Sequence, residues 1–136
     1  MRSIVLVSCV KLKLKHPAQV KDIYISDWFK SALKYAETLN PDLICVLSAK
    51  HGLLALNDEI APYEITLNTM SRKEIKTWAT VVTAKLALLS DLQQDRFVLL
   101  AGEKYRALLV PHLAHYEVPM QGLKFGQQLQ FLKAQL

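Results

Sequence analysis

Three short, uninterrupted apolar runs constrain the fold of this chain more than any other feature. They lie at residues 4–7, 43–47 and 97–100, and each ends directly at polar residues or at a small residue followed by glycine. Such runs are typical of strands that are buried on both faces of a sheet. Helical stretches separate them, and a shorter fourth strand is predicted at residues 116–118. This order predicts an α/β fold in one domain, residues 1–136, with three layers around a mostly parallel central sheet of about four strands.

Capping residues mark the starts of the predicted helices. Ser26 or Asp27 can cap a first helix, and Ser71 followed by Glu74 is a capping box for a second. Residues 22–26 are expected to form a short extended segment ahead of the first helix. Apolar side chains recur at helical spacing near the end of the chain, which predicts a C-terminal helix docked on the core.

The composition excludes several classes of protein. Hydrophobic residues make up 51% of the chain and charged residues 21%, which is typical of a folded domain and not of a disordered chain. No apolar run is long enough to span a bilayer, so we expect a cytoplasmic protein without a membrane partner. Cys9 and Cys45 lie in or at the end of apolar runs, which indicates buried thiols. They lack the spacing of a zinc site, and we expect no metal and no cofactor.

The charge balance favours an anionic partner. The chain has 17 lysines and arginines against 12 acidic residues, a net charge of +5. Nucleic acid is the first candidate partner, with DNA ahead of RNA. Lys11, Lys13 and Lys15 alternate with leucines in one loop, and Lys11 and Lys13 are suited to contact phosphates. A solvated basic loop without a ligand is the alternative interpretation.

Polar chemistry follows each of the three buried strands. If the strands are parallel, their carboxyl ends lie at one edge of the sheet, which is where open α/β sheets bind ligands. The candidate substrate-binding residues at these ends are Ser8, Cys9, Ser48, Lys50, Gly52, Gly102, Tyr105 and Arg106. Each also has an ordinary structural interpretation. Ser48 and Gly52 can make a tight turn, and Cys9 can be an inert buried thiol.

Aromatic and amide side chains complete the candidate binding set. Tyr24, Tyr63 and Tyr105 could stack on a base, because an aromatic face binds any nucleobase. Gln128 could read the edge of a base. Core packing of the three rings and a solvated position for Gln128 are the alternatives.

Two carboxylates and one histidine are the candidate catalytic residues. Glu64, in the irregular stretch 57–70, is the preferred acid and Asp22 the second. Either could orient water or stabilise a cationic sugar, as acids do in glycoside cleavage. His51 could stabilise negative charge on a leaving group or transfer a proton. Ordinary turn acids and a histidine that hydrogen-bonds its own loop are the alternatives.

The motifs together resemble a small bacterial and phage family known as a domain of unknown function, whose members are labelled YaaA-like or tRNA-guanine-transglycosylase-related. The motifs are Ser8-Cys9-x-Lys11-x-Lys13, the LSAKHGL string at 47–53, Pro62-Tyr63, Trp78-Ala79, LAGxxYR at 100–106 and GLxxGxQL at 122–129. Val10 and Leu12 depart from the SCGKKK pattern of that family. The resemblance implies enzymes that act at N-glycosidic bonds in nucleic acid, including DNA glycosylases in phage defence. It also implies a uracil-DNA-glycosylase-like or Rossmann-like sandwich.

Three hypotheses from different classes follow from these observations. The leading one is a metal-free DNA glycosylase that cleaves the bond between a modified base and its deoxyribose, or exchanges the base as a transglycosylase does. The second is a nucleic-acid-binding or nucleotide-binding module without chemistry. The third is a hydrolase or transferase of small nucleotides. The sequence leaves the identity of the base, the catalytic carboxylate and the oligomeric state open.

Overall fold

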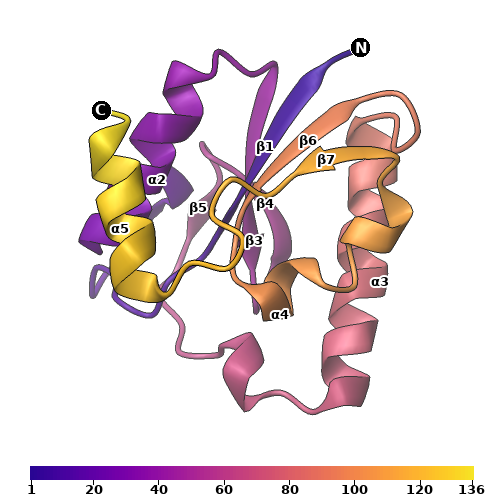
Figure 1. Cartoon of the computed structure of the whole chain (residues 1–136). Helices are drawn as coiled ribbons and strands as arrows, with labels where there is room; N and C mark the ends of the chain where they lie inside the picture. The colour runs from indigo at the N-terminus through magenta and orange to yellow at the C-terminus, as the bar shows by residue number, and fades with distance from the viewer.

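A five-stranded mixed sheet forms the centre of the computed structural model, which describes residues 1–136 (Figure 1). The strand order is β4-β3-β1-β6-β7. Neighbouring strands are parallel except at the β3–β4 edge, which is antiparallel. The strands are β1 (Ser3–Ser8), β3 (Leu43–Ser48), β4 (Gly52–Ala55), β6 (Arg96–Leu100) and β7 (His115–Glu117). The predicted α/β class with a mostly parallel central sheet is confirmed.

Helices cover both faces of this sheet. On one side α2 (Asp27–Thr38) packs beside α5 (Phe125–Ala134), and α3 (Arg72–Leu89) lies on the other side (Figure 1). The predicted caps are present: the Ser26 hydroxyl accepts the Phe29 amide of α2 at 3.1 Å, and Ser71 forms the capping box of α3 with Glu74. The result is the expected three-layer arrangement.

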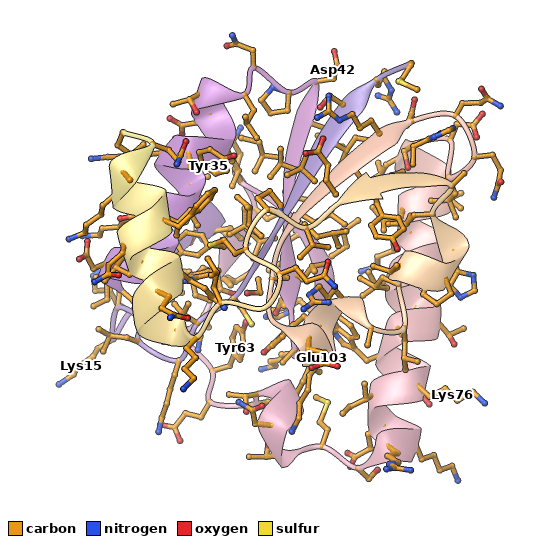
Figure 2. All side chains as sticks on the ribbon, viewed as in Figure 1. Lys15, Tyr35, Asp42, Tyr63, Lys76 and Glu103 are labelled. Carbon is orange, nitrogen blue, oxygen red and sulfur yellow. The ribbon has the colours of Figure 1, made fainter.

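The core explains why the three apolar runs are uninterrupted. Strand β1 pairs with β3 on one side and with β6 on the other, so neither of its edges is free. All four residues from Ile4 to Val7 are fully buried, because helices cover both faces of the strand. Side chains fill the space between the layers, and the charged ones gather at the periphery (Figure 2). Cys9 and Cys45 are buried free thiols, as predicted.

The sheet has five strands rather than about four, because the chain reverses directly after β3. Gly52 has a φ of +78°, a left-handed conformation that favours glycine, and this turn allows Leu53 and Leu54 to pair back onto β3. Gly52 is thus first a turn residue. The expected extended segment 22–26 was also partly wrong. Val20–Ile23 forms one helical turn, α1, and Tyr24 then bridges to Lys13.

The remaining elements are short and lie in the connections. They are β2 (Ala18–Gln19) and β5 (Glu59–Ile60), which pair with each other, and the helical turns η1 (Leu67–Thr69), α4 (Glu103–Arg106) and η2 (Val110–His112). None of the helices has the length and hydrophobicity that a membrane crossing requires.

Candidate functional site

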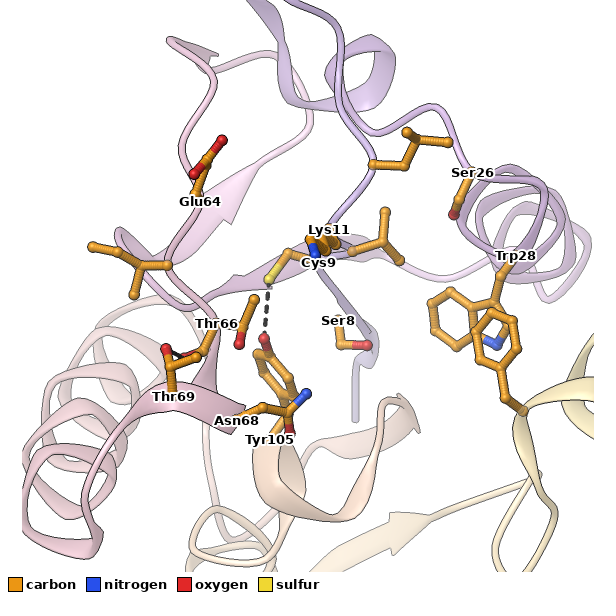
Figure 3. A pocket seen from close by; sticks show the side chains of 14 residues that line it. Ser8, Cys9, Lys11, Ser26, Trp28, Glu64, Thr66, Asn68, Thr69 and Tyr105 are labelled. Atoms are coloured by element: carbon orange, nitrogen blue, oxygen red, sulfur yellow. Dashed lines mark hydrogen bonds between the residues drawn. The ribbon is translucent and has the colours of Figure 1, made fainter.

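A cleft of about 640 Å³ opens at the edge of the sheet where β1 ends (Figure 3). Because β1 is parallel to both β3 and β6, the carboxyl ends of all three strands lie at this edge, as the sequence predicted. Five of the predicted site residues line the cleft: Ser8, Cys9, Lys11, Glu64 and Tyr105. The rest of the lining comes from Val10 and Leu12, from the starts of α2 and α5 and from the segment 65–69.

One wall of the cleft is a pair of stacked aromatic rings. Trp28 and Phe125 lie with their ring centroids 6.5 Å apart and their planes 20° apart (Figure 3). Phe125 is 65% exposed, which is unusual for phenylalanine and leaves its ring accessible. Gln128 accepts the indole N–H of Trp28 at 3.1 Å and donates its own amide to the Leu123 carbonyl at 3.0 Å. Gln128 therefore orients Trp28, and both ends of its side chain are already bonded.

The opposite wall carries a carboxylate and neutral polar groups. Glu64 lies at the rim, and Thr66, Asn68 and Thr69 follow it along the segment (Figure 3). Leu67 is fully buried and anchors η1 in the core, which fixes the polar residues on either side of it. Glu64 is exposed and forms no ion pair or hydrogen bond with the protein, so its oxygens are available to a ligand.

Cys9 and Tyr105 lie between the two walls. The Cys9 thiol and the Tyr105 hydroxyl are 3.4 Å apart and form a hydrogen bond (Figure 3). Burial raises the pKa of Tyr105, with Cys9 adding to the effect, so its hydroxyl is neutral at physiological pH. The Tyr105 ring packs edge-on against Trp78, a buried residue of α3 whose indole N–H donates to the Ser48 carbonyl at 2.8 Å. The neutral Tyr105 hydroxyl therefore lies between the two walls of the cleft.

A chain of buried hydroxyl groups lies beneath the cleft. The Tyr63 hydroxyl is hydrogen-bonded to that of Tyr24 at 2.6 Å and to that of Ser48 at 2.8 Å. Ser48 also accepts the backbone N–H of His51 at 3.1 Å. Burial raises the pKa of Tyr24 to about 12 and raises the pKa of Tyr63 as well. These three predicted binding residues line no part of the main cleft; they join the end of β3 to the segments around residues 24 and 63.

Lys13 is held against this hydroxyl chain from outside. Its ammonium nitrogen lies 4.3 Å from the centroid of the Tyr63 ring and 5.6 Å from that of Tyr24. Burial lowers the pKa of Lys13, and nearby Cys9 and Glu64 oppose that shift. The aromatic faces also favour the cation. We therefore treat Lys13 as a positively charged group with a fixed position.

His51 packs edge-on against the Tyr63 ring, with the two ring centroids 5.5 Å apart. With Lys50 and Gly52 it lines a separate cavity of about 420 Å³ against α3. Burial, together with Lys50 and Lys85, lowers the pKa of His51, so its imidazole is neutral at pH 7. The Nε2 atom is buried and has no hydrogen-bond partner. The structure thus does not bring His51 into the cleft that Glu64 lines.

With this geometry in hand, comparison with known proteins identifies a family. Residues 4–134 match the family described as Family of unknown function (DUF6884). The chain belongs to this family. The matched region runs from β1 into α5 and includes every residue that lines the main cleft. Neither the curated proteins nor the solved structures gave a match. Family membership therefore agrees with the predicted domain of unknown function and assigns no activity.

Three other predicted residues of this DUF6884 chain lie away from the cleft lining. Asp22 is exposed on α1, and Gly102 is exposed at the start of α4, a helix of four residues. Arg106, at the end of α4, is half-buried and its Nε atom has no partner. None of the three lines the cleft. No group of three or more histidines, cysteines or acids is arranged to hold a metal ion.

Sequence reasoning missed the residues that shape the cleft most. Trp28 lies in the first turn of α2, two residues after the Ser26 cap. An aromatic residue there was a detectable signal, because the start of that helix comes after the basic loop in the sequence. Its pairing with Phe125 had no signal, because the two residues are far apart in the sequence. Thr66 and Asn68 lie in a stretch whose pattern is irregular, so their common wall could be recognised only in three dimensions.

Proposed function

We propose that this protein is a nucleobase-processing enzyme, a DNA glycosylase that cleaves the N-glycosidic bond of a modified base. The observation that carries the proposal is the composition of the main cleft. The exposed ring of Phe125, stacked on the buried ring of Trp28, faces a carboxylate without a protein partner, and lysines border the opening. The aromatic ring suits a flat base, the carboxylate suits a sugar that becomes cationic, and the lysines suit phosphates.

The aromatic wall supports the binding of a base that has left the duplex. Stacking on aromatic side chains contributes roughly 1–3 kcal/mol per base, and enzymes that act on a base extrude it into a pocket. The Phe125 ring is accessible for such stacking, and Trp28 is oriented by Gln128. Asn68 and Thr66 supply neutral donors and acceptors for the edge of the base.

Glu64 is the proposed catalytic residue. Its carboxylate would stabilise the oxocarbenium-like sugar and accept a proton from the attacking water, whose oxygen adds to C1′. The C1′–N bond breaks, its electron pair leaves with the base, and the base takes a proton from solvent. Lys11 and Lys13 would hold phosphates. We assign no step to His51, because it lines a different cavity, or to Asp22, which lies outside the cleft.

Strand breakage at abasic sites tests the proposal. The purified protein would be incubated with unmodified DNA and with phage DNAs that carry hypermodified bases, and then heated in alkali. We expect breaks in a modified DNA, a loss of about 10²–10⁴-fold in rate for Glu64→Gln, and an unchanged rate for Glu59→Gln. Glu59 is a suitable control because it is exposed on β5 and lines no part of the cleft. The absence of breaks in every DNA, or full activity of Glu64→Gln, would refute the proposal.

A second candidate is a nucleic-acid-binding module without chemistry. The specific observation that favours it is the single carboxylate in the cleft, because most glycoside-cleaving sites use a pair. This candidate predicts salt-dependent binding of DNA that Glu64→Gln leaves intact, with no abasic sites formed.

Base exchange would need the same cleft and a free base. Adding free bases to the reaction and analysing the DNA for their incorporation therefore distinguishes exchange from hydrolysis.

A further inference from the structure

A second cavity adjoins the main cleft at its rim. It has a volume of about 540 Å³ and lies between the basic loop 11–15 and the segment 62–64. Lys11, Leu12 and Glu64 line both cavities, so the two spaces meet at Glu64. Lysines account for three of its eight lining residues, and Glu64 is the only acidic one. The net charge of the residues that line this cavity is therefore positive, and the cavity lies next to Glu64, the proposed catalytic residue.

The lysines of this cavity project from an ordered backbone. Lys13 bridges to Tyr24, the Leu14 amide donates to the Ile23 carbonyl at 2.9 Å, and the Ile25 amide donates to the Leu12 carbonyl at 3.2 Å. These bonds pin the basic loop to the segment that precedes α2. An ordered loop presents its charges at fixed positions, so less conformational entropy is lost when a ligand binds.

None of these lysines forms an ion pair with an acidic side chain. The three ion pairs of the structure involve Arg2, Arg96 and Lys133, and none involves Lys11, Lys13 or Lys15. Lys13 instead donates to the Lys11 carbonyl at 3.1 Å and lies over the Tyr63 ring. None of the three ammonium groups forms an ion pair, so their charge is available to an anion outside the protein.

We propose that this second cavity is a phosphate subsite for the nucleotide next to the one in the main cleft. The preferred ligand is then a polynucleotide strand and not a free nucleotide. This inference rests on the proposed function, because it takes the main cleft as the place where a base binds. Point charges suit phosphodiesters, which carry one negative charge each, and such contacts position a strand without reading its sequence.

The experiment compares a strand with a single nucleotide. The probes are an unmodified single-stranded oligodeoxynucleotide of five residues, labelled for fluorescence anisotropy, and unlabelled deoxynucleoside monophosphate as a competitor. We expect the strand to bind more tightly than the monophosphate. Lys15→Gln and Lys13→Gln should weaken binding of the strand and leave the competition constant of the monophosphate unchanged. Lys15 is exposed, so its substitution does not disturb the core.

Salt dependence gives the expected magnitude. Each lysine–phosphate contact contributes about 0.7 to the slope of log affinity against log salt for a single strand. The slope for the Lys13→Gln/Lys15→Gln double variant should be smaller by about 1.4. When salt rises from 50 to 200 mM, the loss of affinity of the double variant should therefore be about seven-fold smaller than that of the wild type. Lys76→Gln is the matched control, because Lys76 is exposed on α3 and lies far from Lys15 across the molecule (Figure 2).

The outcomes separate this inference from the proposed function. Equal binding of strand and monophosphate, no measurable binding of the strand, or an equal loss with Lys76→Gln would overturn the phosphate subsite. Binding of polyglutamate as tightly as the strand would also overturn it, because the surface would then be a general polyanion site. If abasic sites form at an unchanged rate in the lysine variants, the subsite fails and the glycosylase stands. If the strand-binding pattern holds without abasic sites, the subsite stands and the chemistry fails.

Discussion

Removing the Tyr63 hydroxyl is the sharpest test of how this site is built. The group is hydrogen-bonded to both Tyr24 and Ser48, whose side chains are 1% and 0% exposed. Tyr63→Phe keeps the ring and its packing and removes both hydrogen bonds. Each bond contributes about 0.5–1.5 kcal/mol, and a buried polar group left without a partner costs about 1–3 kcal/mol. Ser48 still accepts the His51 amide, whereas Tyr24 loses its only side-chain partner.

We therefore expect Tyr63→Phe to lower the free energy of unfolding by about 2–4 kcal/mol. Urea denaturation measures it, with an unchanged slope showing that the folded state remains compact. Tyr24→Phe removes one of the two bonds and should cost less than Tyr63→Phe. Tyr116→Phe is the control, because Tyr116 is 47% exposed on β7 and should cost almost nothing. If Tyr63→Phe were no more destabilising than Tyr116→Phe, the hydroxyl chain would not be an element of stability.

Three further predictions follow from the same contacts. Burial raises the pKa of Tyr24 from 10 to about 12, so the Tyr24 hydroxyl ionises first in the unfolded chain. The contribution of Tyr24 to stability should therefore be constant up to about pH 10 and fall by roughly 2 kcal/mol by pH 12, as measured by the difference between the wild type and Tyr24→Phe in urea titrations at each pH. Phe125→Ala should weaken strand binding by about 5- to 150-fold, because a base stacks on its exposed ring, whereas Trp78→Phe, a change in the core, should alter stability and not affinity. Gly52→Ala should destabilise the fold by about 1 kcal/mol, because Gly52 has a φ of +78°, and an unchanged melting temperature would contradict that strain.

The predictable part of the fold is the part that local chemistry determines. Continuous apolar runs predicted β1, β3 and β6, because strands covered on both faces need apolar residues at every position. The capping box at Ser71 predicted the start of α3 for an equally local reason. Strand β4 was missed, because its pairing depends on the left-handed turn at Gly52 and on the neighbouring strand.

The site was less predictable, because the same residue types serve two purposes. Tyr24, Tyr63 and Ser48 have the chemistry of ligand-binding residues, yet their hydroxyls bond to one another beneath the cleft. Sequence alone cannot distinguish these arrangements, since both place polar residues at strand ends. The same applies to His51 and Glu64, which lie near the same edge of the sheet but line different cavities.

The proposed chemistry and the proposed subsite depend on each other through the exposure of Glu64. A carboxylate in water stabilises a cation 4 Å away by only about 1 kcal/mol, and by about 4 kcal/mol when the effective dielectric constant falls to 20. Glu64 is exposed in the free protein, so a nucleotide that filled the main cleft alone would leave one side of the carboxylate in solvent. A strand that occupied both cavities would cover Glu64 from two sides, because it lies where they meet. The ligand itself would then provide the low-dielectric environment that a single carboxylate needs, which is a physical reason for such an enzyme to act on a strand.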